Sequence, residues 1–449
     1  MSGYSPHTPD EVEAMLGFLG LSSLDELFAV VPDALRLAAG LDLPAGMPEP
    51  DVVARLQDLA AANRPCGRDL VCFAGAGAYD HEVPAVTRAL AARSEFVTSY
   101  TPYQAEVAQG VLQAVFEFQT LVARLSGMSV ANASLYDGAA SLVEAVNLAV
   151  GATGRPEVWV SAGVNPAWRD VLGTFVAGTG HGVRDVALTD GTTDWAGVAE
   201  GAGPPGAVVV AYPNFLGCLE DLGAARAVCD RLGALLVVAF DPVCAAVLRA
   251  PGEWGADVVV GEGQALGMPL SFGGPYLGLF ACSLDHVRRL PGRLVGETVD
   301  TEGRRAYVTT LRTREQDIRR ERATSNVCTN QTLMAVTAAV QLGWLGTSGL
   351  AEVALRSARG ARYCRDGLLG VPGIEPLVGA PVLREFALRL PLDAELAVER
   401  LVDEGFLGGV PVDPRLNGGR RDGLLVAVTE RRTKAEIDAF VESMAKVVR

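Results

Sequence analysis

Two stretches of the sequence place polar side chains directly after short apolar runs. Asp241 ends the run Leu235–Phe240 and precedes Pro242, and Gln264 follows the run Val258–Val260 in a glycine-rich stretch. Such runs predict buried strands of a mostly parallel sheet, whose ligands bind beyond the carboxyl ends of the strands. Asp241 therefore either contacts a ligand or only caps the turn that follows its strand.

The spacing of these two residues can be compared with that of enzymes that use pyridoxal phosphate (PLP). Those with a large sheet use an acid to keep the pyridinium nitrogen protonated and, roughly twenty residues later or somewhat more, a Schiff-base lysine. Gln264 stands twenty-three residues after Asp241, and a glutamine cannot form an imine. The only lysines among the 38 basic residues are Lys434 and Lys446, although a general preference for arginine explains part of this scarcity.

Polar residues at other predicted element ends are further candidates. Tyr136 and Asp137 open an apolar helix, whose free amides can bind a phosphate. Asp137 also fits an ordinary N-cap, and its charge would oppose a phosphate, so the capping role is favoured. Asn214 follows the apolar run Ala207–Tyr212, and His81 follows a glycine-rich segment, where it is equally a site residue or a structural histidine.

A polar aromatic turn precedes the longest helical pattern. Tyr100, Thr101, Tyr103 and Gln104 surround Pro102, which fixes the backbone of the turn. A loop of this composition either lines a site or forms an interface.

The elements that must position these residues divide the chain into three parts. Capping-box sequences at Thr8–Glu11 and Ser23–Glu26, with Asp51 as a third cap, predict a helical arm over residues 1–70. Alternating strands and helices predict a large, mostly parallel α/β domain over 71–330. A small α+β domain is expected over 331–449.

Apolar spacing gives the bounds of the expected elements. Helices are expected at Gln104–Gly127, Leu222–Leu232, Gly349–Leu369, Ala394–Glu404 and from Thr433 onward. Strands are expected at Val158–Val160, Ala207–Tyr212, Leu235–Phe240, Val258–Val260, Phe386–Leu390 and Leu424–Thr429.

Composition excludes several classes of function. The net charge of −15 disfavours nucleic acid and anionic lipid as partners. No segment approaches about 18 uninterrupted apolar residues, and no signal peptide is visible, so we expect no membrane span and a cytoplasmic protein. Eight scattered cysteines without a C-x-x-C pair, and four histidines without ligand spacing, predict no metal site.

Long blocks of the chain resemble the P-protein of the glycine cleavage system, and specifically its separately encoded N-terminal, or alpha, subunit. The resemblance runs from about residue 10 to the C-terminus. Two departures are small: Asn165 stands where relatives often have His, and Arg322 where Lys is common. The matching blocks include YTPYQAEVAQGVLQAVFEFQTLVARLSGMSVANASLYDGA (Tyr100–Ala139), PNFLGCLEDL (Pro213–Leu222), GEGQALGMPLSFGGPYLG (Gly261–Gly278) and the segment Leu290–Gln331.

The resemblance implies the PLP-dependent transferase fold type I and a heterotetramer with a lysine-bearing beta subunit. It also implies that this partner holds PLP and that the complex decarboxylates glycine, releases CO2 and transfers the aminomethyl group to the lipoyl group of the H-protein. This chain, with no covalent cofactor, would close the partner's site through Tyr100, Thr101, Tyr103, Gln104, His81 and Asn214. Tyr136, Asp137, Asp241 and Gln264 would line a vestigial cofactor pocket.

Two other functions remain open at this point. The chain could be purely a structural and binding module that stabilises its partner and recruits the lipoyl carrier. It could also be an independent enzyme that uses neither PLP nor a partner, but the sequence offers no nucleophile–base pair for one.

Overall fold

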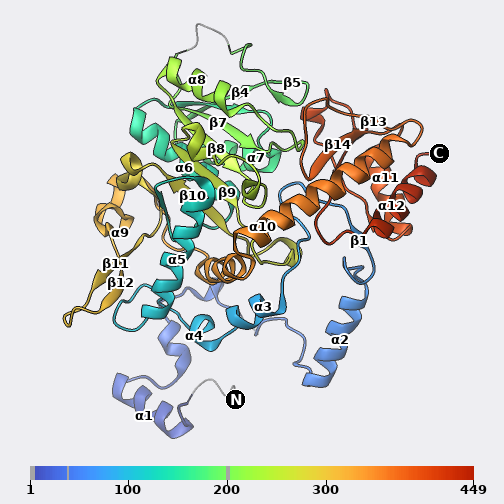
Figure 1. Cartoon of the computed structure of the whole chain (residues 1–449). Helices are drawn as coiled ribbons and strands as arrows, with labels where there is room; N and C mark the ends of the chain where they lie inside the picture. The colour runs from blue at the N-terminus through green and yellow to red at the C-terminus, as the bar shows by residue number, and fades with distance from the viewer. Residues whose placement is uncertain (1–5, 38–39, 199–202) are drawn as a thin grey trace. The chain divides into compact units, whose positions relative to one another are not determined.

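The computed structural model describes residues 6–37, 40–198 and 203–449, and Figure 1 labels most of their helices and many of their strands. The chain divides into two compact units, Met1–Arg64 and Pro65–Arg449, and each is described by itself. All the residues with candidate chemistry belong to the second unit.

The first unit consists of short helices, and one of its three expected caps is confirmed. Thr8 and Glu11 form a capping box at the start of α1 (Pro9–Leu19). Ser23 does not cap, because Glu26 accepts from the backbone of Ser22 instead, and only a 3-10 helix (Leu24–Phe28) follows. Asp51 is not a cap either. The helix α2 (Glu49–Ala61) begins two residues earlier, with a proline in its first turn, so that Asp51 lies inside that turn.

The described part of this first unit has an apolar surface of its own. None of its helices contains a buried residue. Phe18 is 91% exposed and Val30 is 89% exposed, and several leucines are more than half exposed. Exposed large apolar side chains in this number are typical of a segment that makes a protein–protein contact.

The core of the second unit is a seven-stranded sheet in the order β2-β10-β9-β8-β7-β3-β4. Five strands from β9 to β4 run parallel, and β10 runs antiparallel to both its neighbours. β7 (Ala207–Tyr212) and β8 (Leu235–Phe240) have the expected bounds and are almost entirely buried, as parallel strands are. The other strands are β2 (Val130–Ala131), β3 (Glu157–Ser161), β4 (Gly182–Val186), β9 (Val258–Glu262) and β10 (Gly278–Cys282).

Helices cover both faces of this sheet. Alternate residues of β7 point to opposite faces, so Val208 and Val210 pack in one core cluster and Val209 in the other. The first cluster includes residues of α5 (Gln109–Ser126), α8 (Leu222–Leu232) and α10 (Thr332–Leu369). The second includes residues of α6 (Gly138–Thr153) and α7 (Pro166–Val176). This arrangement confirms the expected α/β architecture.

The long helix α5 begins five residues later than the apolar spacing predicted. Residues 101–107 form isolated turns, and Gln109 opens the helix. The side chain of Gln109 donates to the carbonyl of Tyr307, 2.8 Å away, and accepts from its amide. Tyr307 lies on β12 (Arg305–Thr309), which pairs with β11 (Val295–Val299) in an antiparallel hairpin. The start of α5 therefore depends on a contact with a distant segment, which apolar spacing does not reveal.

The C-terminal part contains a four-stranded antiparallel sheet in the order β13-β14-β17-β16. A separate core packs between this sheet and three helices, the second half of α10, α11 (Ala394–Asp403) and α12 (Lys434–Val447). Thr433 and Glu436 form the expected capping box of α12. The strands are β13 (Glu375–Pro376), β14 (Glu385–Arg389), β16 (Val410–Pro411) and β17 (Gly423–Ala427).

The helix α10 links the two cores and is longer than expected. It begins at Thr332 rather than Gly349, with a break at Gly346, which has a φ of 59°. Figure 1 shows it crossing from the large sheet toward the C-terminal sheet. By length and composition alone it could cross a membrane, but Ala335, Ala338 and Leu342 are buried in the core of the large sheet. A core position explains its apolar composition.

Short elements complete the second unit. A two-residue strand β1 (Val71–Cys72) pairs with β15 (Phe406–Leu407), which ties the beginning of this unit to its C-terminal part. The remaining elements include α3 (Ala85–Ala91), α4 (Ser94–Val97), α9 (Gln316–Arg319), β5 (Leu188–Thr189) and β6 (Thr192–Thr193).

Candidate functional site

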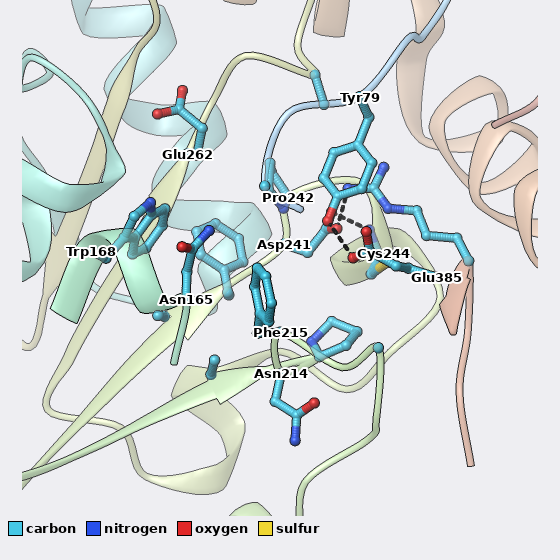
Figure 2. A pocket seen from close by; sticks show the side chains of 18 residues that line it. Tyr79, Asn165, Trp168, Asn214, Phe215, Asp241, Pro242, Cys244, Glu262 and Glu385 are labelled. Atoms are coloured by element: carbon cyan, nitrogen blue, oxygen red, sulfur yellow. Dashed lines mark hydrogen bonds and ion pairs between the residues drawn. The ribbon is translucent and has the colours of Figure 1, made fainter. Parts of the chain in front are cut away.

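A pocket opens at the carboxyl ends of β7, β8 and β9, where the sequence predicted a ligand site (Figure 2). Asp241 and Tyr79 lie on one side of it, and Glu262 and Trp168 lie on the other. The lining residues are Gly77, Tyr79, Asn165, Trp168, Ala211, Pro213, Asn214, Phe215, Gly217, Ala239, Phe240, Asp241, Pro242, Cys244, Glu262, Ala265, Arg384 and Glu385.

Asp241 lies at the end of β8, as expected, and both of its carboxylate oxygens are engaged. Oδ1 accepts from the amides of Val243 at 2.9 Å and Cys244 at 3.1 Å, which is the turn-capping arrangement. Oδ2 forms an ion pair with Arg384, whose side chain is 4% exposed. The two interpretations of Asp241 are therefore combined: it caps its turn and also faces the pocket, where an internal cation neutralises it.

Arg384 connects this carboxylate to the C-terminal sheet. It precedes β14, and its guanidinium carbon lies 3.6 Å from the ring centroid of Tyr79. It also contacts Nε2 of His81. The other ring nitrogen of His81 lies 2.6 Å from Glu430. His81 is thus buried in an ion-pair network, which is the structural role that the sequence left open for it.

Tyr79 and Glu385 form a second polar pair beside Arg384. The hydroxyl of Tyr79 donates to Oε2 of Glu385 at 2.9 Å, and the amide of Ala76 donates to Oε1 at 2.7 Å. Burial raises the pKa of Glu385 to about 7, and these two hydrogen bonds oppose the increase. Burial, together with the nearby Glu385 charge, raises the pKa of the Tyr79 hydroxyl well above its ordinary value.

Gln264 is 1% exposed, and its amide holds a backbone segment in place. Its Oε1 accepts from the amide of Tyr79 at 2.8 Å, and its Nε2 donates to the carbonyls of Tyr79 and Met268 at 3.0 and 2.8 Å. The residue at the predicted lysine position therefore ties residue 79 to the loop after β9. Its hydrogen-bonding groups are used within the chain, and it has no amine for imine formation.

Glu262 is the last residue of β9, and its carboxylate lies at the start of α6, next to the predicted helix cap Asp137. Its Oε2 accepts from the amide of Gly138 at 2.9 Å, and its Oε1 accepts from the amides of Gln264 and Leu277 at 2.9 and 3.0 Å. Burial raises the pKa of Glu262 to about 7, and the three amides oppose this increase. Asp137 caps the helix by accepting from Ala140 at 2.7 Å, as favoured, whereas the neighbouring Tyr136 is 38% exposed.

The two asparagines of the pocket both stabilise loops. Asn214 donates to Gly191 and Glu220 and accepts from the amides of Leu216 and Cys218. Asn165 caps α7 by accepting from Ala167 and donates to the carbonyl of Ala76 at 3.0 Å. Their amides are engaged within the chain, while their side chains still form part of the wall.

The residues of this pocket do not fit PLP. Asp241, the candidate partner of a pyridinium nitrogen, is already paired with Arg384. Gln264 stands in place of the lysine, and the start of α6, the candidate phosphate site, is occupied by the carboxylate of Glu262. No chemical step can therefore be assigned to PLP in this pocket.

The loop with Tyr100, Thr101, Tyr103 and Gln104 lies apart from the residues that line the pocket. Tyr100 is 95% exposed, and Thr101 and Gln104 are exposed and hydrogen-bonded to each other at 3.2 Å. Tyr103 points inward. Its hydroxyl donates to Asn330, and the guanidinium of Arg293 lies 4.2 Å from its ring centroid.

Asn330 joins this loop to the segment that leads into α6. Its Nδ2 donates to the carbonyl of Ala133 at 2.8 Å and to Oγ of Ser134 at 2.9 Å. Burial raises the pKa of the Tyr103 hydroxyl, which keeps it protonated as a donor to Asn330. Of the candidates, Asp241 and Asn214 line the pocket. The other predicted pocket residues are not among its lining residues, nor is His81; they are Tyr136, Asp137 and Gln264. The Tyr100–Gln104 loop, anchored by Tyr103, lies apart from it.

Sequence reasoning missed most of the pocket lining, including the residues that form its hydrogen bonds and ion pairs: Tyr79, Glu262, Arg384 and Glu385. Glu262 ends β9 within the same glycine-rich stretch as Gln264, so the strand-end rule applied to Asp241 would also have found it. Arg384 and Glu385 are adjacent charges at the start of a predicted buried strand, which is a weak signal of burial with partners. No feature of the neighbouring sequence marks Tyr79 as a residue of the pocket.

Comparisons with solved structures agree with the fold. A glycine decarboxylase (P-protein) of the glycine cleavage system, solved in an inhibitor-bound form, matches with a TM-score of 0.91 and 46% identity, covering 99% of each chain. The Lactobacillus brevis glutamate decarboxylase matches with a TM-score of 0.68 at 13% identity, covering 92% of this chain and 95% of that chain, and indicates the fold alone. The architecture is that of PLP-dependent enzymes of fold type I.

Comparisons with curated sequences are equally extensive. A probable glycine dehydrogenase (decarboxylating) subunit 1 from Prosthecochloris aestuarii is 46% identical over 98% of this chain and 99% of its own length. The protein of the same name from Chlorobium chlorochromatii is 47% identical over 98% of both chains. Residues 2–444 match the family described as glycine cleavage system P-protein. The chain therefore belongs to the glycine cleavage system P-protein family, in which its relatives along the full length are subunit 1 of the decarboxylating glycine dehydrogenase.

Proposed function

We propose that this chain is the subunit of the P-protein that holds no cofactor, and that it completes a PLP site on a lysine-bearing partner subunit. In this proposal two copies of each subunit decarboxylate glycine and transfer the aminomethyl group to the lipoyl arm of the H-protein. When bound to the partner, PLP supplies the electron sink that decarboxylation requires. This chain binds the partner, positions a loop and excludes water.

The environment of Gln264 is the observation that carries this proposal. A buried, fully hydrogen-bonded glutamine occupies the position predicted for the lysine. Lys434 and Lys446 both lie on α12, exposed and paired with Asp438 and Glu404. Neither lysine lines the pocket. A member of this family without a usable lysine needs a partner that supplies one.

The loop before α5 is the part of this chain that we assign to the partner's site. Tyr100 and Thr101 expose hydroxyl groups, which suit contact with a polar ligand on another subunit. Tyr103 anchors the loop through Asn330 and through the stacking of Arg293. Tyr103 is therefore a positioning residue, and Tyr100 and Thr101 are the groups proposed to reach the partner.

Tyr103→Phe tests this assignment in the complex assembled with the partner subunit. The substitution removes one hydroxyl and its hydrogen bond to Asn330, worth about 1 kcal/mol, while the ring remains under Arg293. We expect kcat for glycine decarboxylation to fall about tenfold, because a loop displaced by a fraction of an ångström no longer positions its polar groups. Turnover is measured by CO2 release and assembly by sedimentation.

Tyr363→Phe is the matched control, because the hydroxyl of Tyr363 donates to Asp438 on the exposed side of α10 and α12. It should leave turnover unchanged. Equal turnover in wild type and Tyr103→Phe, with both complexes intact, would contradict the role given to this loop. It would favour a chain that only stabilises its partner.

The apolar surface of the first unit is the proposed contact with the partner subunit. Phe18→Ser combined with Val30→Ser is expected to weaken association at least about tenfold, since burying such side chains stabilises by about 1.5–3 kcal/mol each. Because both side chains are exposed, thermal unfolding of the isolated chain should not change. Titration of one subunit into the other measures the affinity. Unaltered affinity would place the interface elsewhere on the chain.

A further inference from the structure

The start of α6 lies behind Glu262, which lines the pocket, and it is the place near the pocket where backbone amides could bind a phosphate group. Helix amides and the helix dipole favour an anion at such a position. Here the anion belongs to the chain itself. The carboxylate of Glu262, at the end of β9, accepts from Gly138 at the start of α6 and from Gln264 and Leu277, which lie near the two ends of the connection between β9 and β10.

We propose that Glu262 is a built-in substitute for the phosphate group of a cofactor, and that it closes this pocket to phosphorylated ligands independently of the missing lysine. Three backbone amides, one from the start of α6 and two from the β9–β10 connection, converge on one carboxylate, as they would on a phosphate. A phosphate that entered would have to displace Glu262 or lie beside it. Both Glu262 and the capping carboxylate of Asp137 would repel the phosphate there.

The surrounding side chains leave little space for a second anion. A Cβ atom added at Gly138 would lie 2.1 Å from the ring of Trp168, so the indole lies directly against the first turn of α6. A Cβ atom at Gly278 would lie 2.6 Å from the carbonyl of Asp137, so β10 closes the other side. Figure 2 shows Trp168 and Glu262 together at this end of the pocket.

At the end of the pocket near Asp241, a side chain of the protein again occupies the position of a cofactor group. Arg384 pairs with Asp241 and so takes the place that a protonated ring nitrogen would take. The pocket thus carries an internal anion at its phosphate end and an internal cation at its ring end. Any occupant that the remaining space accepts is expected to be an unphosphorylated small molecule.

The test compares phosphorylated and unphosphorylated 4-deoxypyridoxine, which differ only in the phosphate. Neither has the aldehyde that would label Lys434 and Lys446. Binding to the full chain is measured by calorimetry, well above the pKa of Glu262, which burial raises to about 7. We expect Glu262→Ala to bind the phosphorylated form at least about tenfold more tightly than wild type does. Affinity for the unphosphorylated form should change less than about twofold.

Glu144→Ala is the matched control, because Glu144 is another buried glutamate, located on α6 but away from its first turn. It should not improve binding of the phosphorylated form. Glu262→Gln keeps the shape of the side chain and removes only its charge, so it should gain part of the affinity even if Glu262→Ala folds poorly. The proposal is overturned if neither Glu262 variant binds the phosphorylated form more tightly than wild type.

These results are separate from those that test the assembly with a partner. They use the isolated full chain and no turnover measurement, so a failure here would leave the proposed role of the Tyr100–Gln104 loop untouched. Conversely, loss of that role would not alter the contacts that Glu262 makes within this chain.

Discussion

Arg384→Ala is expected to lower the free energy of unfolding by about 3–5 kcal/mol, because it leaves the carboxylate of Asp241 without its cation in a buried site. The side chains of Arg384 and Asp241 are 4% and 15% exposed. The same substitution removes the guanidinium from the face of Tyr79 and from His81. Urea unfolding followed by circular dichroism measures the loss.

A double-mutant cycle separates the ion pair from the other contacts of Arg384. The double variant Asp241→Ala, Arg384→Ala should lose clearly less free energy of unfolding than the two single variants lose in sum. In the double variant neither buried charge remains without its partner. Arg415→Ala is the control. Arg415 also pairs with two aspartates, but it is half exposed, so its loss should cost less than about 1 kcal/mol. Equal costs at positions 384 and 415 would contradict the importance of burial here.

The cycle also measures how the two sheets of the second unit are joined. Asp241 follows β8 of the large sheet, whereas Arg384 precedes β14 of the C-terminal sheet. The segment with Tyr79 and His81 lies between them and bonds to both sides through Gln264, Glu385 and Glu430. The chain therefore uses its own charged side chains to connect the two sheets across the pocket.

The elements best predicted from sequence are those whose signal is local. β7, β8 and α8 have the expected bounds, because apolar runs and capping residues mark both ends. The start of α5 was wrong, since it depends on Gln109 binding Tyr307, nearly two hundred residues away. Ser23 does not cap a helix, because Glu26 accepts a hydrogen bond from the backbone of Ser22 instead. Residue spacing alone does not show which of the two adjacent serines Glu26 will bind.

The site was predicted in outline for the same reason. Asp241 and Gln264 could be found from strand ends and from the distance between them in sequence. Their partners could not, because Arg384 and Tyr79 approach Asp241 and Gln264 only after folding. A strand end indicates where a side chain points, but it does not say which distant residue neutralises it. Asp241 was thus placed correctly, while its pairing with Arg384 was not foreseen.

Raising the pH from about 4.5 to about 7 is expected to destabilise the folded chain. Burial raises the pKa values of Glu144, Glu262 and Glu385 from 4.5 to about 7. Between these values the folded state binds more protons than the unfolded state, so the free energy of unfolding falls as pH rises and levels off above about 7. Each residue contributes at most about 3 kcal/mol to this loss.

Glu144→Gln isolates one of these contributions, because Glu144 lies outside the pocket and one of its carboxylate oxygens has no hydrogen-bond partner among the described residues. Glutamine has nearly the same shape and stays neutral, so the variant should lose less stability than wild type over this pH range. An exposed glutamate on α12 supplies the control, Glu442→Gln, which should follow the wild-type curve. Urea unfolding at a series of pH values measures the difference.

The direction in which the free energy of unfolding changes with pH also distinguishes the three buried glutamates from Glu430. The hydrogen bond and charge of His81 lower the pKa of Glu430 despite the opposing effect of its burial, so its contribution to stability is lost only as pH falls below about 4.5. The two effects therefore act in different pH ranges. Stability that instead rises between about 4.5 and 7 would mean that the three buried glutamates are ionised without cost. The amides around Glu262 would then have to outweigh its burial, and Glu144→Gln would leave the curve unchanged.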